Sequence, residues 1–287
     1  MSLLVVGCRR GGAALEPSNF SARAAESLLG APAEVALSVD LAAIRSDDVY
    51  GPMLARSWPG TLGDDRSLRW LTSRVDRLDL WLVGVGWSEQ PSSALAVFRG
   101  RIEEADLGPR LLGLRLERRL VLPSGVVMFV VDTRGVLSAG FLLDGALVFA
   151  TGAAMAPAQL HFSETRAVPA PLDWGPGALA GVYGRQTALA KVLPGDPSHQ
   201  VAGSAVWRDG RHGDLVVTIS LDHDETTERV YEWAQELPDA QADNARRCRG
   251  LARMGVYPER SGQQVRVRVT GLPAVLEASL ADRLCST

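Results

Sequence analysis

The chain has 287 residues, of which 46% are apolar and 22% are charged, the composition of an ordinary globular protein with a sizeable core. Its formal net charge is −3, from 30 basic and 33 acidic residues, and no segment is strongly basic, so the charge pattern of a nucleic-acid-binding protein is excluded. No apolar run reaches the roughly 18–20 residues that a membrane-spanning helix needs.

The N-terminal segment, MSLLVVGCRRGG, allows a first interpretation as a lipid-attachment signal. Residues 5–8 (VVGC) resemble a bacterial lipobox, in which a small residue precedes a cysteine that receives lipid and becomes the mature N-terminus. The following residues up to 33 are rich in Gly, Ala, Ser and Pro, as expected of a tether. However, only seven residues precede Cys8, whereas a secretory signal needs a charged start and about 7–15 apolar residues.

A second interpretation makes residues 3–7 a strand that runs into a glycine-rich turn. Gly7, Gly11 and Gly12 are partly similar to a nucleotide-binding loop, but Arg9 stands where that loop requires its middle glycine. A chance match to the lipobox is the remaining alternative. Under the first interpretation the protein lies at the periplasmic face of the envelope, in the outer membrane; if Met1 is the true start without a signal, it is cytoplasmic.

Residues 34–156 are predicted to form a first α+β domain after a tether over residues 1–33. Asp40 is placed to cap a helix that begins at Leu41. The apolar spacing from Leu68 to Leu78 predicts another helix, because the positions share one helical face. The remaining predictions are a helix over residues 103–114 and strands over residues 34–40, 80–87, 94–102 and 116–122.

Residues 126–151 read VVMFVVDTRGVLSAGFLLDGALVFAT and predict an antiparallel meander. Three apolar runs are separated by two turn signals. The second signal, Asp144-Gly145, is typical of a tight hairpin turn in which the central residues need positive φ. The valines and phenylalanines of the runs favour a pleated surface packed on a core.

A proline-rich segment over residues 157–177 is predicted to link the first domain to a second α+β domain, residues 178–287. Acidic residues at the start of residues 224–237 predict a helix there, which Pro238 would end. The other predicted helices cover residues 187–193, 242–254 and 272–284, and the predicted strands cover residues 178–183, 201–207, 215–221 and 264–270. The fold class is therefore α+β, with antiparallel sheets and helices on one face, and the order of elements also allows two similar units in tandem.

Three stretches of residues 34–152, EVALSVDLAAIRSDDVYGPML, ALAVFRGRIEEADL and DTRGVLSAGFLLDGALVFAT, resemble uncharacterised exported proteins and lipoproteins of high-GC Gram-negative bacteria. The shared features are a strand followed by a D-L-A-A helix, a strand ending in R-G-R, and a late hairpin. The resemblance implies an exported protein with an α+β fold, and it implies no activity.

The three cysteines fit an exported protein. If Cys8 carries lipid, Cys248 and Cys285 remain as a candidate disulfide pair, which suits an oxidising periplasm. The alternative is that both are small buried hydrophobic residues.

Catalytic and metal-binding signatures are weak. None of the four histidines stands in a zinc-binding spacing, and the G-x-S-x-G motif of serine hydrolases is absent from the sequence. The densest group of ligand-type residues is Asp222, His223 and Asp224, before a helix; acidic residues also belong at a helix N-terminus for electrostatic reasons alone. Trp81, Val83, Val85 and Trp87 share one strand face, which is interpreted as core rather than as an exposed binding surface.

The favoured hypothesis is a non-enzymatic envelope lipoprotein that is anchored to the membrane at Cys8 and binds an envelope protein or has a structural role. No cofactor and no nucleic-acid partner is predicted. The alternatives are a periplasmic protein that binds a small ligand or lipid on a sheet face, and a hydrolase with a site near His223.

Overall fold

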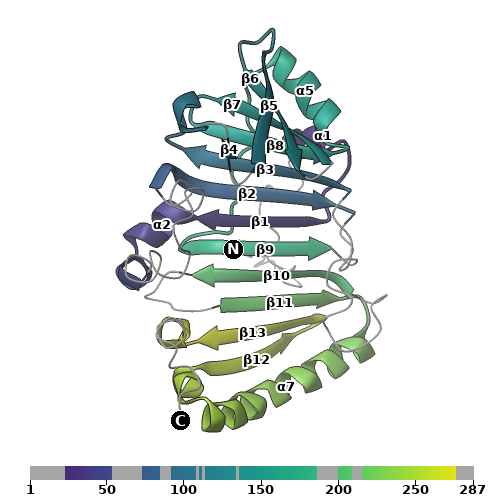
Figure 1. Ribbon diagram of the computed structural model, residues 1–287. Coiled ribbons are helices and arrows are strands. Elements are labelled where there is room, and N and C mark those ends of the chain that lie inside the picture. Colours follow the sequence, from purple (N-terminus) through teal and green to yellow (C-terminus); the bar gives the residue numbers. More distant parts are fainter. Residues whose placement is uncertain are drawn as a thin grey trace, which may run out of the picture.

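The computed structural model describes residues 23–53, 73–84, 92–107, 110–111, 114–133, 136–185, 200–208 and 215–275. Within these ranges the chain forms one antiparallel sheet with the strand order β12-β13-β11-β10-β9-β1-β2-β3-β8-β7-β6-β5-β4 (Figure 1). The strands are β1 (Val35–Asp40), β2 (Val75–Val83), β3 (Ser93–Gly100), β4 (Arg110–Leu111), β5 (Leu114–Val121), β6 (Val127–Thr133), β7 (Val136–Leu143), β8 (Ala146–Gly152), β9 (Ala178–Arg185), β10 (Gln200–Arg208), β11 (Leu215–Leu221), β12 (Gly255–Ser261) and β13 (Gln264–Thr270).

Helices lie at the ends and on the faces of this sheet, so the α+β fold is confirmed (Figure 1). Among the described residues, no helix has both the length and the apolar character needed to cross a bilayer. The helices with both ends described are α1 (Arg23–Leu29), α2 (Leu41–Ser46), α5 (Met155–Glu164) and α7 (Asp224–Arg247), with 3-10 helices η1 (Glu104–Leu107) and η3 (Arg249–Arg253). Residues 50–53, 73–74 and 272–275 are also helical, and the last of these begin the helix predicted over residues 272–284.

The predicted meander is confirmed as β6, β7 and β8, which pair in sequence order. Gly145 has a φ of 72° in the turn between β7 and β8, the conformation that made Asp144-Gly145 a hairpin signal. The strands at this end run steeply across those in the middle of the sheet (Figure 1), as accumulated right-handed twist produces.

One strand joins the two halves of the chain. β1 pairs with β2 on one side and with β9 on the other, so residues 34–156 and residues 178–287, predicted to be separate domains, contribute to the same sheet. The pairing of β1 with β9 connects positions more than a hundred residues apart in the sequence, and local sequence patterns carry no signal for such a contact.

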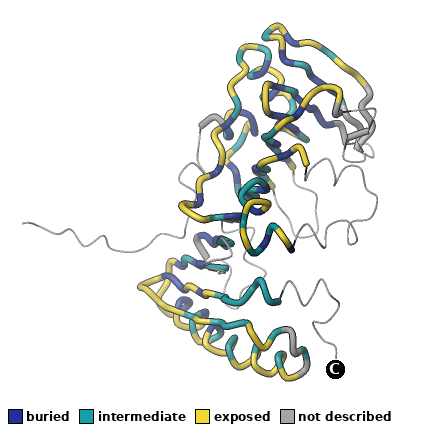
Figure 2. The backbone as a smooth tube through the Cα atoms, turned by 90° about the vertical axis from the view of Figure 1, so that its left-hand side faces the viewer, coloured by how far each residue is buried: buried dark blue, intermediate teal, exposed yellow. Residues whose placement is uncertain are grey.

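The helices pack on both faces of the sheet, whereas the sequence predicted one. Ala36, Trp81 and Leu95 stand opposite one another on β1, β2 and β3 and belong to the hydrophobic cluster that contains residues of α1 and α5. Ile219 and Val265 belong to the hydrophobic cluster beneath α7. Successive side chains of a strand point to opposite faces of the sheet. Ile219 is in register with Val35, the neighbour of Ala36, so its side chain points to the face opposite that of Ala36. Buried residues concentrate in the half that carries α1 and α5 (Figure 2).

The end of the predicted tether is folded. Residues 23–29 form α1, and Ala25, Leu28 and Leu29 are completely buried in the cluster that also contains Trp81. The prediction of a tether extending to residue 33 is therefore wrong for residues 23–33. The missed signal is the apolar spacing of these three residues, which suits one short helical face.

Of two predicted helices of the first half, one is too long and the other is wrong in the described residues. Ser73 and Arg74 are helical, in line with the first of these predictions. Val75 to Leu78 belong to strand β2, which is hydrogen-bonded to β1 and β3, so pairing on both sides overrides the helix-like spacing. The described residues among 103–114 form the single turn η1, then β4 and the first residue of β5. The predicted short helix over residues 187–193 lies outside the described residues.

The helix at residue 224 is longer than predicted. α7 continues through Pro238 to Arg247, although a proline removes one backbone hydrogen bond of a helix. Its residues in the hydrophobic cluster on β11 and β13 all precede Pro238, and beyond the proline Gln241 Nε2 donates to the carbonyl of Leu251 in η3. The second predicted helix over residues 242–254 is replaced by the end of α7 and by η3. Strand β12 was not predicted; it lies at the sheet edge, where Pro258 is tolerated and opposes pairing with a further strand.

Candidate functional site

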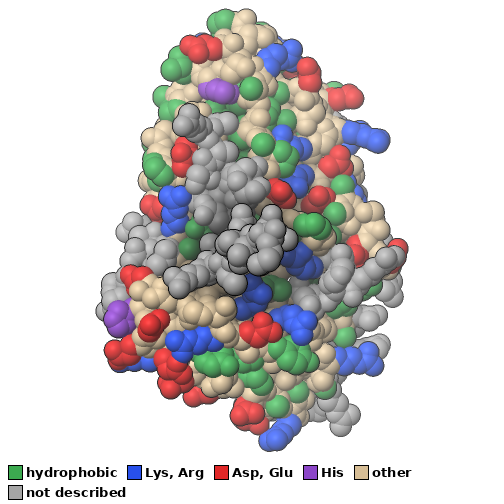
Figure 3. Space-filling view, turned by 180° about the vertical axis from the view of Figure 1, so that it is seen from behind, with side chains coloured by type: hydrophobic (Ala, Val, Ile, Leu, Met, Phe, Trp, Pro, Cys, Tyr) green, Lys and Arg blue, Asp and Glu red, His purple; other side chains and the backbone are tan. Residues whose placement is uncertain are grey.

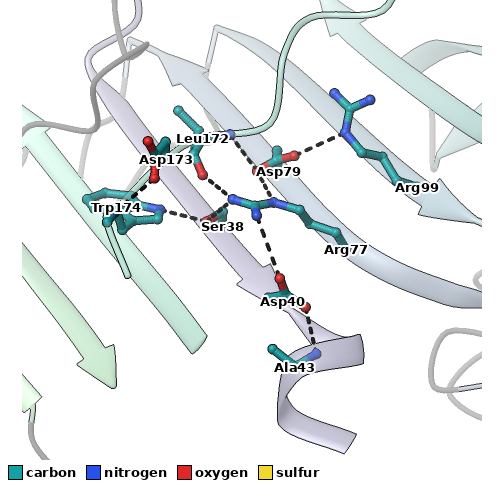
Figure 4. A network of polar contacts seen from close by, with 10 residues as sticks. Ser38, Asp40, Ala43, Arg77, Asp79, Arg99, Leu172, Asp173 and Trp174 are labelled. Atoms are coloured by element: carbon teal, nitrogen blue, oxygen red, sulfur yellow. Dashed lines mark hydrogen bonds and ion pairs between the residues drawn. The ribbon is translucent and has the colours of Figure 1, made fainter. Parts of the chain in front are cut away.

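Charged and hydroxyl side chains gather on one face of the sheet, near the ends of β1 and β3 and the start of β2 (Figure 4). The strand register places Ser38 opposite Asp79, and it places Arg77 between Asp40 and Arg99. Because side chains alternate along a strand, these five residues point to the same face, the one that carries α1 and α5.

Asp79 is the centre of the group and is 0% exposed. Arg77 Nε lies 3.2 Å from its Oδ1 and Arg99 Nε lies 3.5 Å from its Oδ2. The backbone N–H of Leu172 donates to Oδ1 over 3.2 Å. Both carboxylate oxygens are therefore engaged, as a buried charge requires.

Burial dominates the electrostatics of the group. It raises the pKa of Asp79 above its ordinary value, while the charges of Arg77 and Arg99 and the Leu172 N–H act in the opposite direction. Burial likewise lowers the pKa of Arg99, and the Asp79 carboxylate partly offsets this change. The two arginines thus compensate for only part of the cost of burying the carboxylate.

The group binds the main chain of residues 165–177, which cross the strands and are called the strap below. Arg77 Nη2 donates to the carbonyl of Leu172, and Arg99 Nη2 donates to the carbonyl of Pro169. With the Leu172 N–H, three backbone groups of the strap are thereby satisfied by side chains of the sheet. The segment predicted as a linker over residues 157–177 is thus most of α5 followed by a packed strap.

Trp174 fixes the far end of the strap. Its Nε1 donates to Ser38 Oγ over 2.6 Å, and its ring is buried. A Cβ on Gly181, which stands opposite Ser38 on β9, would lie only 2.3 Å from that ring. Glycine is therefore required at this position so that the indole can lie flat on the sheet.

The geometry makes this network a clamp for the strap. Asp79 faces arginines and backbone rather than solvent, and Asp40 also accepts the N–H of Ala43 over 2.7 Å as the cap of α2. In the described part of the chain, no three His, Cys, Asp or Glu side chains are placed to hold one metal ion.

Of the cysteines singled out from the sequence, Cys248 lies in the described residues, directly after α7, and it is disulfide-bonded. Cys8 and Cys285 lie outside the described residues. Lipidation of Cys8 and the pairing of Cys248 with Cys285 stay predictions.

The acidic group before α7 is at the surface. Asp222, His223 and Asp224 are all exposed, and His223 occupies the N-cap position of the helix without a side-chain hydrogen bond to it. Asp224 and Glu225 fill the first turn, where acidic side chains interact favourably with the helix dipole. In the described part of the chain, these residues do not form a group that could hold a metal ion.

The interpretation of Trp81 as core is confirmed, because it is buried with Val83 packed against its cluster. Val85 and Trp87 lie outside the described residues. The clamp itself was missed by sequence reasoning, since Arg77 fell in a predicted helix. The available signal was the alternation of Arg77 and Asp79 with apolar residues in a strand.

In comparisons with known proteins, no family model and no curated protein matches this sequence. Solved structures of TP0453 are similar in fold. Crystal form III matches with a TM-score of 0.52 at 10% identity, covering 89% of this chain and 97% of that chain. Crystal form IV matches with a TM-score of 0.49, also at 10% identity, covering 89% and 94%. At this identity, crystal form III supports the α+β fold and no function.

Proposed function

We propose that the protein is a non-enzymatic component of the periplasmic face of the bacterial envelope, anchored by lipid on Cys8, where it binds a partner protein or has a structural role. The observation that carries the proposal is the disulfide at Cys248. Disulfides persist in oxidising compartments and are rare in the cytosol. A disulfide and a lipobox-like sequence around Cys8 are both expected of a protein at the periplasmic face of the envelope.

The described charges support a binding or structural role. The most deeply buried carboxylate, Asp79, is engaged in holding the strap and is closed off from solvent. On the face seen in Figure 3, acidic and basic side chains are interspersed rather than gathered in a field of one sign. Such a surface suits a protein partner better than a nucleic acid.

The test is to express the gene with its native upstream region and to measure the intact mass of the membrane-associated product. A mature chain that begins at a diacylglyceryl-modified Cys8 is the expected result. The matched control is Cys8→Ser, which keeps the size of the side chain and removes the lipidated atom.

A soluble product that retains Met1, and whose mass differs from that of Cys8→Ser only by the exchange of one sulfur for one oxygen, would overturn the anchor. Labelling of free thiols before and after reduction tests the compartment separately. Free thiols in every cysteine of protein taken directly from the native cell would place the chain in a reducing compartment and remove the proposal.

A further inference from the structure

Three buried polar side-chain atoms of the described residues have no hydrogen-bond partner: Trp81 Nε1, Ser204 Oγ and Thr218 Oγ1. The strand register places all three in one row on the same face. Thr218 stands opposite Ser204, and the row then passes through Tyr183 and Ala36 to Trp81. Two of the three atoms are therefore direct neighbours on β10 and β11.

The pair of hydroxyls is the sharper anomaly. Ser204 is 4% exposed and Thr218 is 0% exposed. Side chains directly opposite in an antiparallel pair have Cβ atoms roughly 4.5–5.5 Å apart. Most buried polar atoms in native proteins are paired, so two adjacent unpaired hydroxyls call for a missing partner.

The chemistry of the row specifies that partner. An indole N–H is only a donor, and a hydroxyl can always donate, so the row is rich in donors that lack acceptors. One oxygen placed between Ser204 and Thr218 could accept from both. A carboxylate oxygen is the strongest such acceptor, because hydrogen bonds to charged groups are shorter and stronger than those between neutral groups.

The surroundings supply an apolar wall and a positive charge. Ala202 and Val206 lie two residues on either side of Ser204, on the same face, and both belong to the main hydrophobic cluster. Arg266 of β13 stands opposite Thr218 and is exposed. An acid with an apolar body therefore meets hydroxyl donors, aliphatic side chains and a guanidinium within three neighbouring strands.

We infer that Ser204 and Thr218 form the polar floor of a binding site for a small organic carboxylate with an apolar body, and that Arg266 attracts its acidic group. The inference is independent of the envelope anchor. Because both hydroxyls are closed off from solvent, a ligand reaches them only when the atoms over this face move. Binding is therefore coupled to a local opening of the protein.

The experiment measures the melting temperature of the full-length protein with increasing decanoate, below the concentration at which it forms micelles. The test variant is Ser204→Ala combined with Thr218→Val, which removes both hydroxyls and nearly keeps the volumes. The matched control is Ser220→Ala, on the same face of β11, where the hydroxyl accepts from Gln264 Nε2 over 3.2 Å and is already partnered.

Decanoate is expected to raise the melting temperature of the wild type and of Ser220→Ala, since a ligand that binds only the folded protein stabilises it. The double variant is expected to lose this response. Arg266→Gln is expected to weaken the apparent affinity by about tenfold, the effect of about 1.4 kcal/mol. Without ligand, the double variant should melt at the same temperature as the wild type or higher, because two unsatisfied groups are gone.

Two results would overturn the inference. The first is an equal response to decanoate in the wild type and in the double variant, or an equal response of the wild type to decan-1-ol, which lacks the carboxylate. The second is a lack of response of the wild type to decanoate, whatever the melting temperature of the double variant without ligand.

Discussion

The backbone N–H of Leu172 donates to the carboxylate of Asp79 over 3.2 Å, although 93 residues separate the two in the chain. The carbonyl of the same leucine accepts a hydrogen bond from Arg77, which forms an ion pair with the Asp79 carboxylate. The strap is therefore held by both polar groups of one residue.

Arg77→Met is expected to destabilise the protein by about 3–5 kcal/mol at pH 7, because it leaves a buried carboxylate with one remaining cation. Chemical unfolding in urea measures the change. The control is Arg229→Met on α7, whose ion pair with Glu225 is exposed and should contribute below about 0.5 kcal/mol. Similar losses in the two variants would mean that Arg77 contributes no more than a surface charge.

Asp79→Asn is expected to leave stability unchanged or higher at pH 7. Burial raises the pKa of Asp79 above 3.8, so the folded protein holds this proton more tightly than the unfolded chain. The stability that the protonated Asp79 carboxyl contributes is fully present below pH 3.8, and it is lost as the pH rises through the pKa of Asp79 in the folded protein. Asparagine avoids that loss and keeps an oxygen for the Leu172 N–H.

Urea unfolding of the wild type and of Asp79→Asn between pH 3 and pH 8 checks this sign. The advantage of the variant should shrink as the pH falls towards 3.8. A variant that is less stable than the wild type by about 2 kcal/mol or more at pH 7 would contradict it, since the ion pairs would then outweigh the cost of burial.

Gly181→Ala is expected to destabilise the protein by about 1–3 kcal/mol, because the added methyl group meets the ring of Trp174. In the background of Trp174→Ala the same change should cost much less, since the ring is gone. A double-mutant cycle by urea unfolding isolates this coupling. Additive losses would show that the indole does not lie against Gly181.

Cys248→Ser is expected to lower stability by about 2–4 kcal/mol, the usual contribution of a disulfide. Reduction of the wild type should give the same loss, and reductant should not affect the variant further. Peptide mapping without reduction identifies the partner, which is predicted to be Cys285. Quantitative alkylation of Cys248 in unreduced native protein would contradict the bond.

Local patterns of the sequence predicted much of the sheet. The strand over residues 264–270 is confirmed with the same bounds as β13, because alternating valines and arginines fit only a strand with one buried face. The meander and the start of α7 are confirmed for similar reasons: turn glycines, apolar runs and acidic first-turn residues act within a few positions of one another.

The clamp could not be predicted in the same way. Arg77 and Asp79 lie in a stretch whose spacing also fits a helix, and their partners in the strap are far away in the chain. Pairing with β1 and β3 decided that these residues are extended, and so decided which side chains share a face.

The sequence by itself thus determined the α+β class, the meander and the strand β13, because each depends on interactions between near neighbours. Only the tertiary structure decided that both halves form one sheet through β1 and β9, that residues 165–177 are a strap, and that Asp79 is buried between two arginines. The physical reason is that these features depend on contacts between distant residues, whose free energy exists only once the chain has folded.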